Sequence, residues 1–202
     1  MTFEGCEGSG KSTQLRFLGE YLRQIGADFI MTREPGGSRI AEDVRRIILN
    51  GEYTEMCSEC EALLYAAARI QHLKEVVEPA LAAGKLVVCD RYVDSSFAYQ
   101  GVARGLGIGF IESINSYALK NYPPDITLFL DISPAAAFDR KHGADLNDRL
   151  EKLGLEFHER VYAGYKSLIP KYPRICAVDC SGTKFETAEK IKNLLIAKDI
   201  LR

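Results

Sequence analysis

The stretch Gly5-Cys6-Glu7-Gly8-Ser9-Gly10-Lys11-Ser12 matches the phosphate-binding pattern G-x-x-x-x-G-K-[ST]. Glycines in this pattern allow backbone N–H groups to surround a polyphosphate without a Cβ clash. Its lysine reaches the β- and γ-phosphates, and the hydroxyl that follows ligates Mg²⁺. An apolar segment precedes the loop and an amphipathic one follows it, which predicts a strand, the loop and an anion-binding helix N-terminus. The stretch therefore predicts a nucleoside triphosphate site and leaves the acceptor open.

The composition is that of an ordinary globular protein. The chain has 202 residues, of which 47% are hydrophobic and 27% charged, and its formal net charge is −2. This length predicts one domain over residues 1–202. The small net charge argues against nucleic acid and membrane surfaces as partners, and no apolar run approaches the ~20 residues of a membrane span. A basic and apolar leader is lacking before the loop, so we expect a cytoplasmic protein.

Short apolar runs alternate with segments of helical spacing along the chain. The runs predict strands at residues 1–3, 27–31, 86–89, 126–132 and 176–179, and the spacing predicts helices at 12–25, 40–49, 59–83, 110–120, 149–168 and 184–200. Pro79 is expected to kink the third of these helices, and the glycine-rich residues 101–109 are expected to form a loop. The alternation predicts a three-layer α/β fold, with helices flanking a five-stranded parallel sheet.

Charged residues follow the expected strands, at the sheet edge where ligands of parallel sheets gather. Asp90 is typical of the Mg²⁺-side carboxylate of P-loop enzymes, and Arg91 suits a second phosphate. The alternative for this pair is a surface ion pair. Five arginines either supply the cations that phosphoryl transfer needs or belong to a solvated surface: Arg33, Arg69, Arg91, Arg140 and Arg149.

The six cysteines are expected to be reduced thiols. Four of them have spacings that leave a zinc site open as an alternative: Cys57, Cys60, Cys176 and Cys180. The favoured interpretation is that they are small apolar residues, and that Ser58 and Glu61 form a capping box at a helix start. Cys6 is expected to be inert unless the helix N-terminus lowers its pKa.

Six segments together resemble the thymidylate kinases. They are FEGCEGSGKST (3–13), TREPGG (32–37), EALLYAAARIQH (61–72), DRYVDSSFAYQG (90–101), PPDITLFLDISP (123–134) and DRLE (148–151), in the family's order. TREPGG together with DRY-x-x-SS-x-AYQG is far more specific than a P-loop alone. The resemblance implies a P-loop nucleoside monophosphate kinase fold and Mg²⁺-dependent transfer of the γ-phosphate of ATP to dTMP, giving dTDP for dTTP synthesis. It also implies a homodimer and a short lid at about residues 140–152.

On the ATP side, the resemblance assigns the phosphates and Mg²⁺ to the P-loop and the adenine to later segments. The implied ATP-binding residues are Gly5, Cys6, Glu7, Gly8, Ser9, Gly10, Lys11, Ser12, Thr13, Arg140, Ser181, Gly182 and Thr183, and the implied metal residues are Ser12 and Asp90. Arg140 would lie over the adenine, with residues 181–183 as the other wall. Because the P-loop contains no arginine, the lid is expected to supply one, with Arg149 as first candidate and Arg140 or Lys141 as alternatives.

On the dTMP side, the resemblance assigns ten residues: Glu7, Arg33, Pro35, Tyr65, Arg69, Arg91, Ser95, Ser96, Tyr99 and Gln100. Arg91 would grip the phosphate with help from Arg33, and Glu7 would approach the sugar 3′-hydroxyl. Tyr65 would stack on thymine, and Arg69 would donate to its O4. The implied catalytic residues are Lys11, Glu7, Arg91 and Arg149.

Selection of a thymine deoxynucleotide is implied for two further positions. Ser96 would face the N3 edge of the base, and Tyr99 would pack under the deoxyribose and reject a 2′-hydroxyl, with Gln100 beside it. Two alternatives stay open. A kinase of the same fold would act on dUMP or another deoxynucleotide, since one methyl group is worth only ~1–3 kcal/mol. A GTPase-like switch would need an [NT]-K-x-D motif, which the chain lacks.

Overall fold

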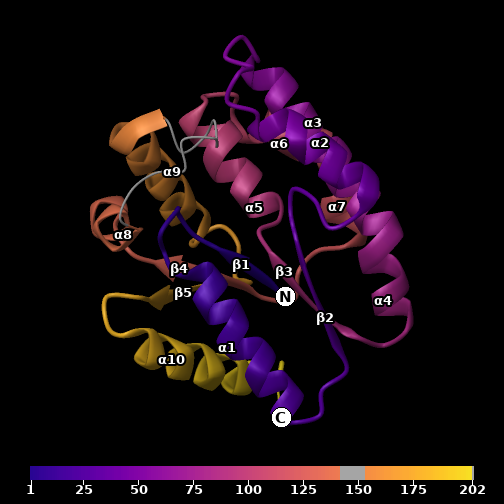
Figure 1. The fold of residues 1–202 in the computed structure, drawn as a ribbon, viewed down its shortest axis with the longest axis vertical. Coiled ribbons are helices and arrows are strands. Elements are labelled where there is room, and N and C mark those ends of the chain that lie inside the picture. The colour runs from indigo at the N-terminus through magenta and orange to yellow at the C-terminus, as the bar shows by residue number, and fades with distance from the viewer. Residues whose placement is uncertain (142–152, 202) are drawn as a thin grey trace.

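The structure, a computed structural model, describes residues 1–141 and 153–201 and has a parallel sheet at its centre (Figure 1). Its strands are β1 (Thr2–Glu4), β2 (Phe29–Arg33), β3 (Leu86–Asp90), β4 (Thr127–Asp131) and β5 (Ile175–Asp179). They lie in the order β2-β3-β1-β4-β5, and each neighbouring pair is parallel. The predicted five-stranded parallel sheet is therefore confirmed.

Two helices, α1 (Lys11–Gln24) and α10 (Lys184–Ala197), lie side by side on one face of the sheet (Figure 1). Leu22 of α1 and Ile191 of α10 are buried there in one apolar cluster with Leu128 of β4. The apolar positions of α1 recur at helical spacing, so the helix presents one apolar side to the sheet.

The other face of the sheet carries α9 (Gly154–Leu168) and η2 (Phe97–Ala103), a π-helical segment. The remaining helices are α2 (Arg39–Leu49), α3 (Ser58–His72), α4 (Glu78–Ala82), α5 (Val93–Ser96), α6 (Ile108–Ile114), α7 (Ser116–Asn121) and α8 (Pro134–Lys141), with η1 (Leu73–Val77) as a second π-helical segment. Phe129 of β4 stacks on Tyr165 of α9 at 5.0 Å between ring centroids. Because side chains alternate along a strand, the burial of Phe129 and its neighbour Leu128 means that β4 is covered on both faces.

The helix expected over residues 59–83 is divided into three segments. α3 ends at His72, the π-helical turn η1 follows, and Pro79 lies in the first turn of α4. Proline has no N–H, and its ring clashes with the carbonyl four residues before it, here that of Glu75 within η1. The chain thus accommodates Pro79 by widening the preceding turn.

The loop expected over residues 101–109 is shorter in the structure, since η2 continues to Ala103 and α6 begins at Ile108. A Cβ on Gly101 would lie 3.3 Å from Cγ1 of Ile111 and 3.4 Å from Cδ1 of Ile108. Gly101 is therefore a point of close packing against α6, where the sequence pattern predicted a loop. The helix expected over 110–120 is present as α6 and α7, with a break at Asn115.

Strand register gathers the site residues at one edge of the sheet. Phe3 pairs with Asp90 on one side of β1, and Glu4 pairs with Phe129 on the other. The P-loop therefore leaves β1 between the carboxyl ends of β3 and β4, the position at which parallel sheets bind ligands. Within residues 1–141 and 153–201, no helix has the length and apolar character needed to cross a membrane.

Candidate active site

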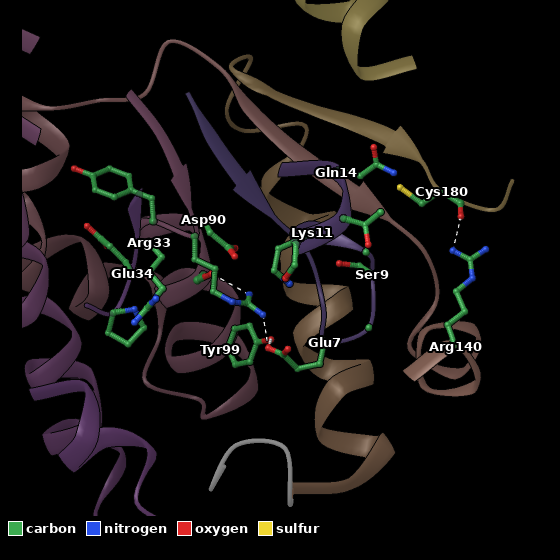
Figure 2. Close-up of a pocket in the computed structure, with 18 of the residues that line it drawn as sticks. Glu7, Ser9, Lys11, Gln14, Arg33, Glu34, Asp90, Tyr99, Arg140 and Cys180 are labelled. Carbon is green, nitrogen blue, oxygen red and sulfur yellow. Dashed lines mark hydrogen bonds and ion pairs between the residues drawn. The ribbon is translucent and has the colours of Figure 1, made fainter. Parts of the chain in front are cut away.

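A cavity of about 830 Å³ opens at this edge of the sheet, a volume within the usual range for small-ligand sites. Figure 2 shows Arg33 and Glu34 at one end, Arg140 and Cys180 at the other, and Lys11 between them. The sequence-predicted residues that line it are Glu7, Gly8, Ser9, Gly10, Lys11, Ser12, Thr13, Arg33, Pro35, Tyr65, Arg69, Asp90, Arg91, Ser95, Tyr99, Gln100, Arg140 and Gly182.

Two glycines give the P-loop its shape. Gly10 is the N-cap of α1 with φ 93°, and Gly8 has φ 75°, both in the region that favours glycine. A Cβ on Gly8 would lie 2.4 Å from the carbonyl oxygen of Ala137 in α8, so the loop passes too close to α8 for any side chain. The loop then enters α1, whose N–H groups and dipole attract an anion.

Lys11 is buried and lies against the loop that carries it. Its Nζ donates to the carbonyl oxygens of Gly5 and Cys6 at 3.0 and 3.1 Å. Burial, and then the charge of Arg91, lowers the pKa of Lys11. A polyphosphate beside the ammonium would oppose both effects, because an anion stabilises the charged form. Burial raises the pKa of the Cys6 thiol to about 11, which favours the protonated, less reactive form.

Arg91 follows β3 in a left-handed backbone conformation, φ 67°. Its Nη1 donates to the carbonyl oxygen of Gly5 at 3.0 Å, to Tyr165 Oη at 3.2 Å and to Ser95 Oγ at 3.3 Å. Its Nη2 forms an ion pair with Glu7. A residue other than glycine persists at such a φ only where its surroundings hold it, and these four contacts do so.

Tyr99 lies beneath this guanidinium, with 5.3 Å between the Arg91 Cζ and the ring centroid. Its hydroxyl donates to Glu7 Oε1 at 3.5 Å. Burial raises the pKa of Tyr99, so the hydroxyl stays protonated and remains a donor. Glu7, Arg91 and Tyr99 therefore form one polar group on the P-loop side of the cavity (Figure 2 labels Glu7 and Tyr99).

Ser12 and Asp90, the two predicted metal residues, both line the cavity. Asp90 Oδ1 is buried and has no hydrogen-bond partner among the described residues. A buried carboxylate oxygen without a partner is costly, and a hydrated divalent cation would satisfy it. Hydroxyl and carboxylate oxygens are the ligands that Mg²⁺ prefers, so this donor set fits Mg²⁺.

The side chain of Arg69 in α3 is only 2% exposed, and four groups hold it in one orientation. Its Nε donates to Glu34 Oε2 at 2.7 Å, its Nη2 to the oxygens of Tyr92 (backbone) and Ser96 (Oγ) at 3.2 Å, and its Nη1 to Asn115 Oδ1. A guanidinium has five N–H donors, and these contacts within the described part of the chain use four. One Nη1 donor of Arg69 remains for a ligand in the cavity that it lines.

Glu34 links Arg69 to a second buried group. Its Oε1 lies 3.0 Å from His72 Nδ1, and His72 Nε2 lies 2.7 Å from Thr32 Oγ1. With Cys89, Glu34 and His72 form the one potential metal-ligand cluster found among the described residues, in which one ligand atom of each residue lies within 4.8 Å of the others. Hydrogen bonds already occupy both histidine nitrogens, so the cluster supports Arg69 and is a poor metal site. The four cysteines weighed as zinc ligands form no such cluster in residues 1–141 and 153–201.

Two arginines lie near the TREPGG segment. Arg33 forms an ion pair with Glu42 of α2 at 2.8 Å, and its side chain is about half exposed. Arg45 donates to the carbonyl oxygen of Pro35 at 2.8 Å and lines the cavity. Arg45 was not predicted as a site residue, because on an amphipathic surface helix it resembles any solvated charge.

The capping box expected from Ser58 and Glu61 is wrong. The N-cap of α3 is Cys57, which makes no side-chain capping bond. Glu61 Oε1 instead accepts from Gln100 Nε2 at 2.8 Å, and its Oε2 accepts from Arg104 Nη2 at 2.9 Å. Glu61 is 1% exposed, and a buried carboxylate needs a cationic partner more than an exposed helix end needs a cap.

At the other end of the cavity, Arg140 joins α8 to the loop after β5. Its Nη1 donates to the carbonyl oxygen of Cys180 at 2.9 Å (Figure 2), and its Nη2 to that of Ser181 at 3.2 Å. Thr183 is the N-cap of α10 and forms a capping box with Glu186. The side chain of Thr183 therefore serves the helix, while its loop borders the cavity.

Some predicted residues do not line the cavity: Gly5, Cys6, Ser96, Ser181 and Thr183. The carbonyl oxygens of Gly5 and Cys6 accept hydrogen bonds from Lys11, and Ser96 Oγ accepts one from Arg69. Arg149 and most of the expected lid lie outside the described residues.

An enzyme that phosphorylates a nucleoside monophosphate needs two anion sites side by side, one for each phosphate. This chain has a buried P-loop lysine next to an arginine at the end of the neighbouring strand, on a parallel α/β sheet. The fold and site thus define a P-loop nucleoside monophosphate kinase.

Comparison with known proteins gives the family. The family model described as thymidylate kinase matches residues 3–191. The chain is 45% identical over 201 residues to the thymidylate kinase of Finegoldia magna, covering 100% of this chain and 99% of the relative. It is 50% identical over 184 residues to that of Geobacillus thermodenitrificans, covering 89% and 81%. The crystal structure of thymidylate kinase from Ehrlichia chaffeensis superposes with a TM-score of 0.79 at 30% identity over 96% of each chain.

The chain belongs to the thymidylate kinase family, the enzymes that phosphorylate dTMP to dTDP with ATP on the route to dTTP. The predictions of fold class, family and enzyme activity are therefore confirmed.

Proposed function

We propose that phosphoryl transfer from ATP to dTMP takes place in this cavity, with the donor phosphates on Lys11 and the acceptor phosphate on Arg91. The observation that carries the proposal is that Lys11 Nζ and Arg91 Nη1 donate to the same Gly5 carbonyl oxygen, each at 3.0 Å. Two cations on one oxygen repel each other unless anions join them. A γ-phosphate and an acceptor phosphate would supply those anions and would lie adjacent for in-line transfer.

ATP would occupy the P-loop end of the cavity. Its phosphates would lie over the loop N–H groups of residues 8–13, and its adenine between Arg140 and the loop 181–183. The hydrogen bonds from Arg140 to the carbonyl oxygens of Cys180 and Ser181 support this placement, because they hold the guanidinium beside that loop. Mg²⁺ held by Ser12 and Asp90 would neutralise charge between the two phosphates.

dTMP would occupy the other end, with Tyr65 stacked on thymine and the remaining Nη1 donor of Arg69 on the base O4. An N–H donor fixed at this place would bind the O4 oxygen of thymine or uracil. It would repel the amino group that cytosine carries at the same position, because two donors cannot form a hydrogen bond. Tyr99 would lie beneath the deoxyribose and reject a 2′-hydroxyl. Glu7 would position the 3′-hydroxyl.

Four further residues would complete this acceptor end: Arg33, Pro35, Ser95 and Gln100. Ser96 does not line the cavity and accepts a hydrogen bond from Arg69. It would therefore influence the N3 edge of the base indirectly, by holding the Arg69 guanidinium in place.

Further features of the working enzyme belong to the same proposal. The chain would act as one catalytic domain, with Arg149 as the lid cation, in the cytoplasm. It would be a homodimer joined through α2 and α3, because large apolar side chains of both helices are exposed, among them Ile47 and Leu63 at 43% and 51%. Sedimentation of Leu63→Asp would test the dimer, since a charge in the interface should yield monomers.

An ADP-release assay with Mg²⁺ and ATP tests the acceptor. We expect strong turnover with dTMP, weaker turnover with dUMP, and negligible turnover with dCMP and ribonucleotides. Arg91→Ala should abolish turnover with dTMP. Normal turnover by that variant would refute the assignment of the acceptor phosphate, and a preference for dCMP would refute that of Arg69.

A further inference from the structure

The carboxyl group of Glu4, which the assigned site does not use, is completely buried directly behind the P-loop. Glu4 is the last residue of β1 and is 0% exposed. Four donors converge on its two oxygens, and they come from the segment after β3 and from α9. Burying a carboxylate is costly, so four donors on one buried carboxyl group indicate that Glu4 has a role beyond ending the strand.

Two of the four donors are backbone N–H groups at the start of α5. Glu4 Oε1 accepts from the N–H of Tyr92 at 2.7 Å and from the N–H of Ser95 at 3.2 Å. Tyr92 is the N-cap of α5 and provides no side-chain cap, so Glu4 caps the helix from a neighbouring strand. Backbone N–H groups cannot turn into acceptors, and they therefore fix Glu4 in an accepting role.

The other two donors are hydroxyls that also hold Arg91. Glu4 Oε2 accepts from Ser95 Oγ at 2.5 Å and from Tyr165 Oη at 2.8 Å. Each hydroxyl has one proton. While both protons point to Glu4, both oxygens keep their lone pairs for Arg91 Nη1, which lies 3.3 Å from Ser95 Oγ and 3.2 Å from Tyr165 Oη.

A second arrangement of these hydroxyls competes with the first. Ser95 Oγ and Tyr165 Oη lie 2.9 Å apart, so either is able to donate to the other. In that arrangement one hydroxyl donates its proton to the other hydroxyl and no longer to Glu4. The accepting oxygen then has one lone pair fewer for Arg91. A carboxylate at position 4 disfavours this arrangement, because it accepts both protons and offers none.

We propose that Glu4 is a positioning residue for phosphoryl transfer: its carboxylate orients the hydroxyls of Ser95 and Tyr165 so that they hold the Arg91 guanidinium toward the acceptor phosphate. This inference rests on the role of Arg91 proposed above. It makes the orientation of Arg91 depend on a group that touches neither substrate.

Charged groups of both signs surround Glu4. Burial, and then the carboxylate of Asp94, raises the pKa of Glu4 to about 7, while Arg91 and the two hydroxyls oppose the rise. Asp94 is itself paired with Arg174, whose Nη1 and Nη2 lie 2.5 and 2.8 Å from its oxygens. Two carboxylates, one on β1 and one on α5, thus lie among two guanidiniums, one after β3 and one before β5.

The test compares Glu4→Gln with the parent chain at about pH 8, where both Glu4 and the substrate phosphate are ionised. The amide has the shape of the carboxyl, but its NH₂ faces at least one of the four donors. Calorimetry would measure the affinity for dTMP and for thymidine, which has the same base and sugar and no phosphate. We expect dTMP affinity to fall about tenfold and thymidine affinity to stay within about twofold.

Two reference variants separate the possible outcomes. Asp94→Asn also removes a buried carboxylate from this region, but one with no hydrogen bond to the contacts of Arg91, so it should leave the dTMP-to-thymidine affinity ratio unchanged. Arg91→Lys should lower that ratio. If Arg91→Lys leaves the ratio unchanged, the proposed function fails. If it lowers the ratio and a folded Glu4→Gln does not, or if Glu4→Gln weakens both ligands equally, this inference alone is overturned.

Tyr165→Phe provides the test if Glu4→Gln does not fold. It removes one of the two hydroxyls that hold Arg91 and leaves the carboxyl and the helix cap in place. The ratio should again fall, with a smaller change than in Glu4→Gln. An unchanged ratio would overturn the inference.

Discussion

Removal of the Glu34 carboxylate is expected to destabilise the fold by about 3–5 kcal/mol. Glu34 and Arg69 form an ion pair at 2.7 Å, and each side chain is only 2% exposed. Glu34→Ala leaves the guanidinium charged, buried and short of one acceptor, and it also removes the partner of His72 Nδ1. For a chain of this length, a loss of that size lowers the midpoint of thermal unfolding by roughly 6–20 °C.

Urea denaturation of four proteins would measure this coupling: the parent chain, Glu34→Ala, Arg69→Met and the double variant. The double variant should lose at least ~2 kcal/mol less than the sum of the single losses, because the buried charge disappears with its partner. Glu20→Ala is the matched control, since it breaks an exposed pair with Arg16 at 2.9 Å and should cost less than ~1 kcal/mol. Single losses that add within ~0.5 kcal/mol would refute the reasoning.

Gly8→Ala should weaken ATP binding and lower the melting temperature, because its Cβ would lie 2.4 Å from the Ala137 carbonyl oxygen; an unchanged ATP affinity by calorimetry would contradict this. Thr183→Ala should cost ~1 kcal/mol in urea denaturation through the lost cap of α10, whereas Thr183→Ser should not. Because burial raises the pKa of Glu4 from 4.5 to about 7, the folded state holds more protons than the unfolded state between these values. The free energy of unfolding from this group therefore falls as the pH rises through that window, and Glu4→Gln should lack this decline in thermal scans. Arg149→Ala should lower kcat far more than dTMP affinity, and an unchanged kcat would move the lid cation elsewhere.

The sheet and the P-loop were predictable because their signals are local. Strands buried on both faces, such as Leu86–Asp90, have continuous apolar runs, and the P-loop glycines stand at fixed spacing. The π-helical turns were not predictable from local patterns: η1 accommodates Pro79, and Gly101 within η2 packs closely against α6.

The supporting contacts of the site could not be predicted from the sequence, because they join residues far apart in the chain. Glu4 finds its hydroxyl partners 91 and 161 residues away, and Arg69 finds Glu34 35 residues before it and Asn115 46 residues after it. No local pattern distinguishes a glutamate at the end of a strand from a solvated one. The signal available was chemical, namely a carboxylate next to a phosphate site with no obvious neighbour of opposite charge.

The central place of β1 has a consequence for synthesis on the ribosome. Its hydrogen-bonding neighbours are β3 and β4, and its last residue reaches Tyr165. The P-loop is thus translated before β3, β4 and α9, on which its shape depends, and it is shaped late because contacts so distant in sequence form late. Because a ligand stabilises only the folded site, a nascent chain gains no stabilisation from ATP until α9 has left the exit tunnel.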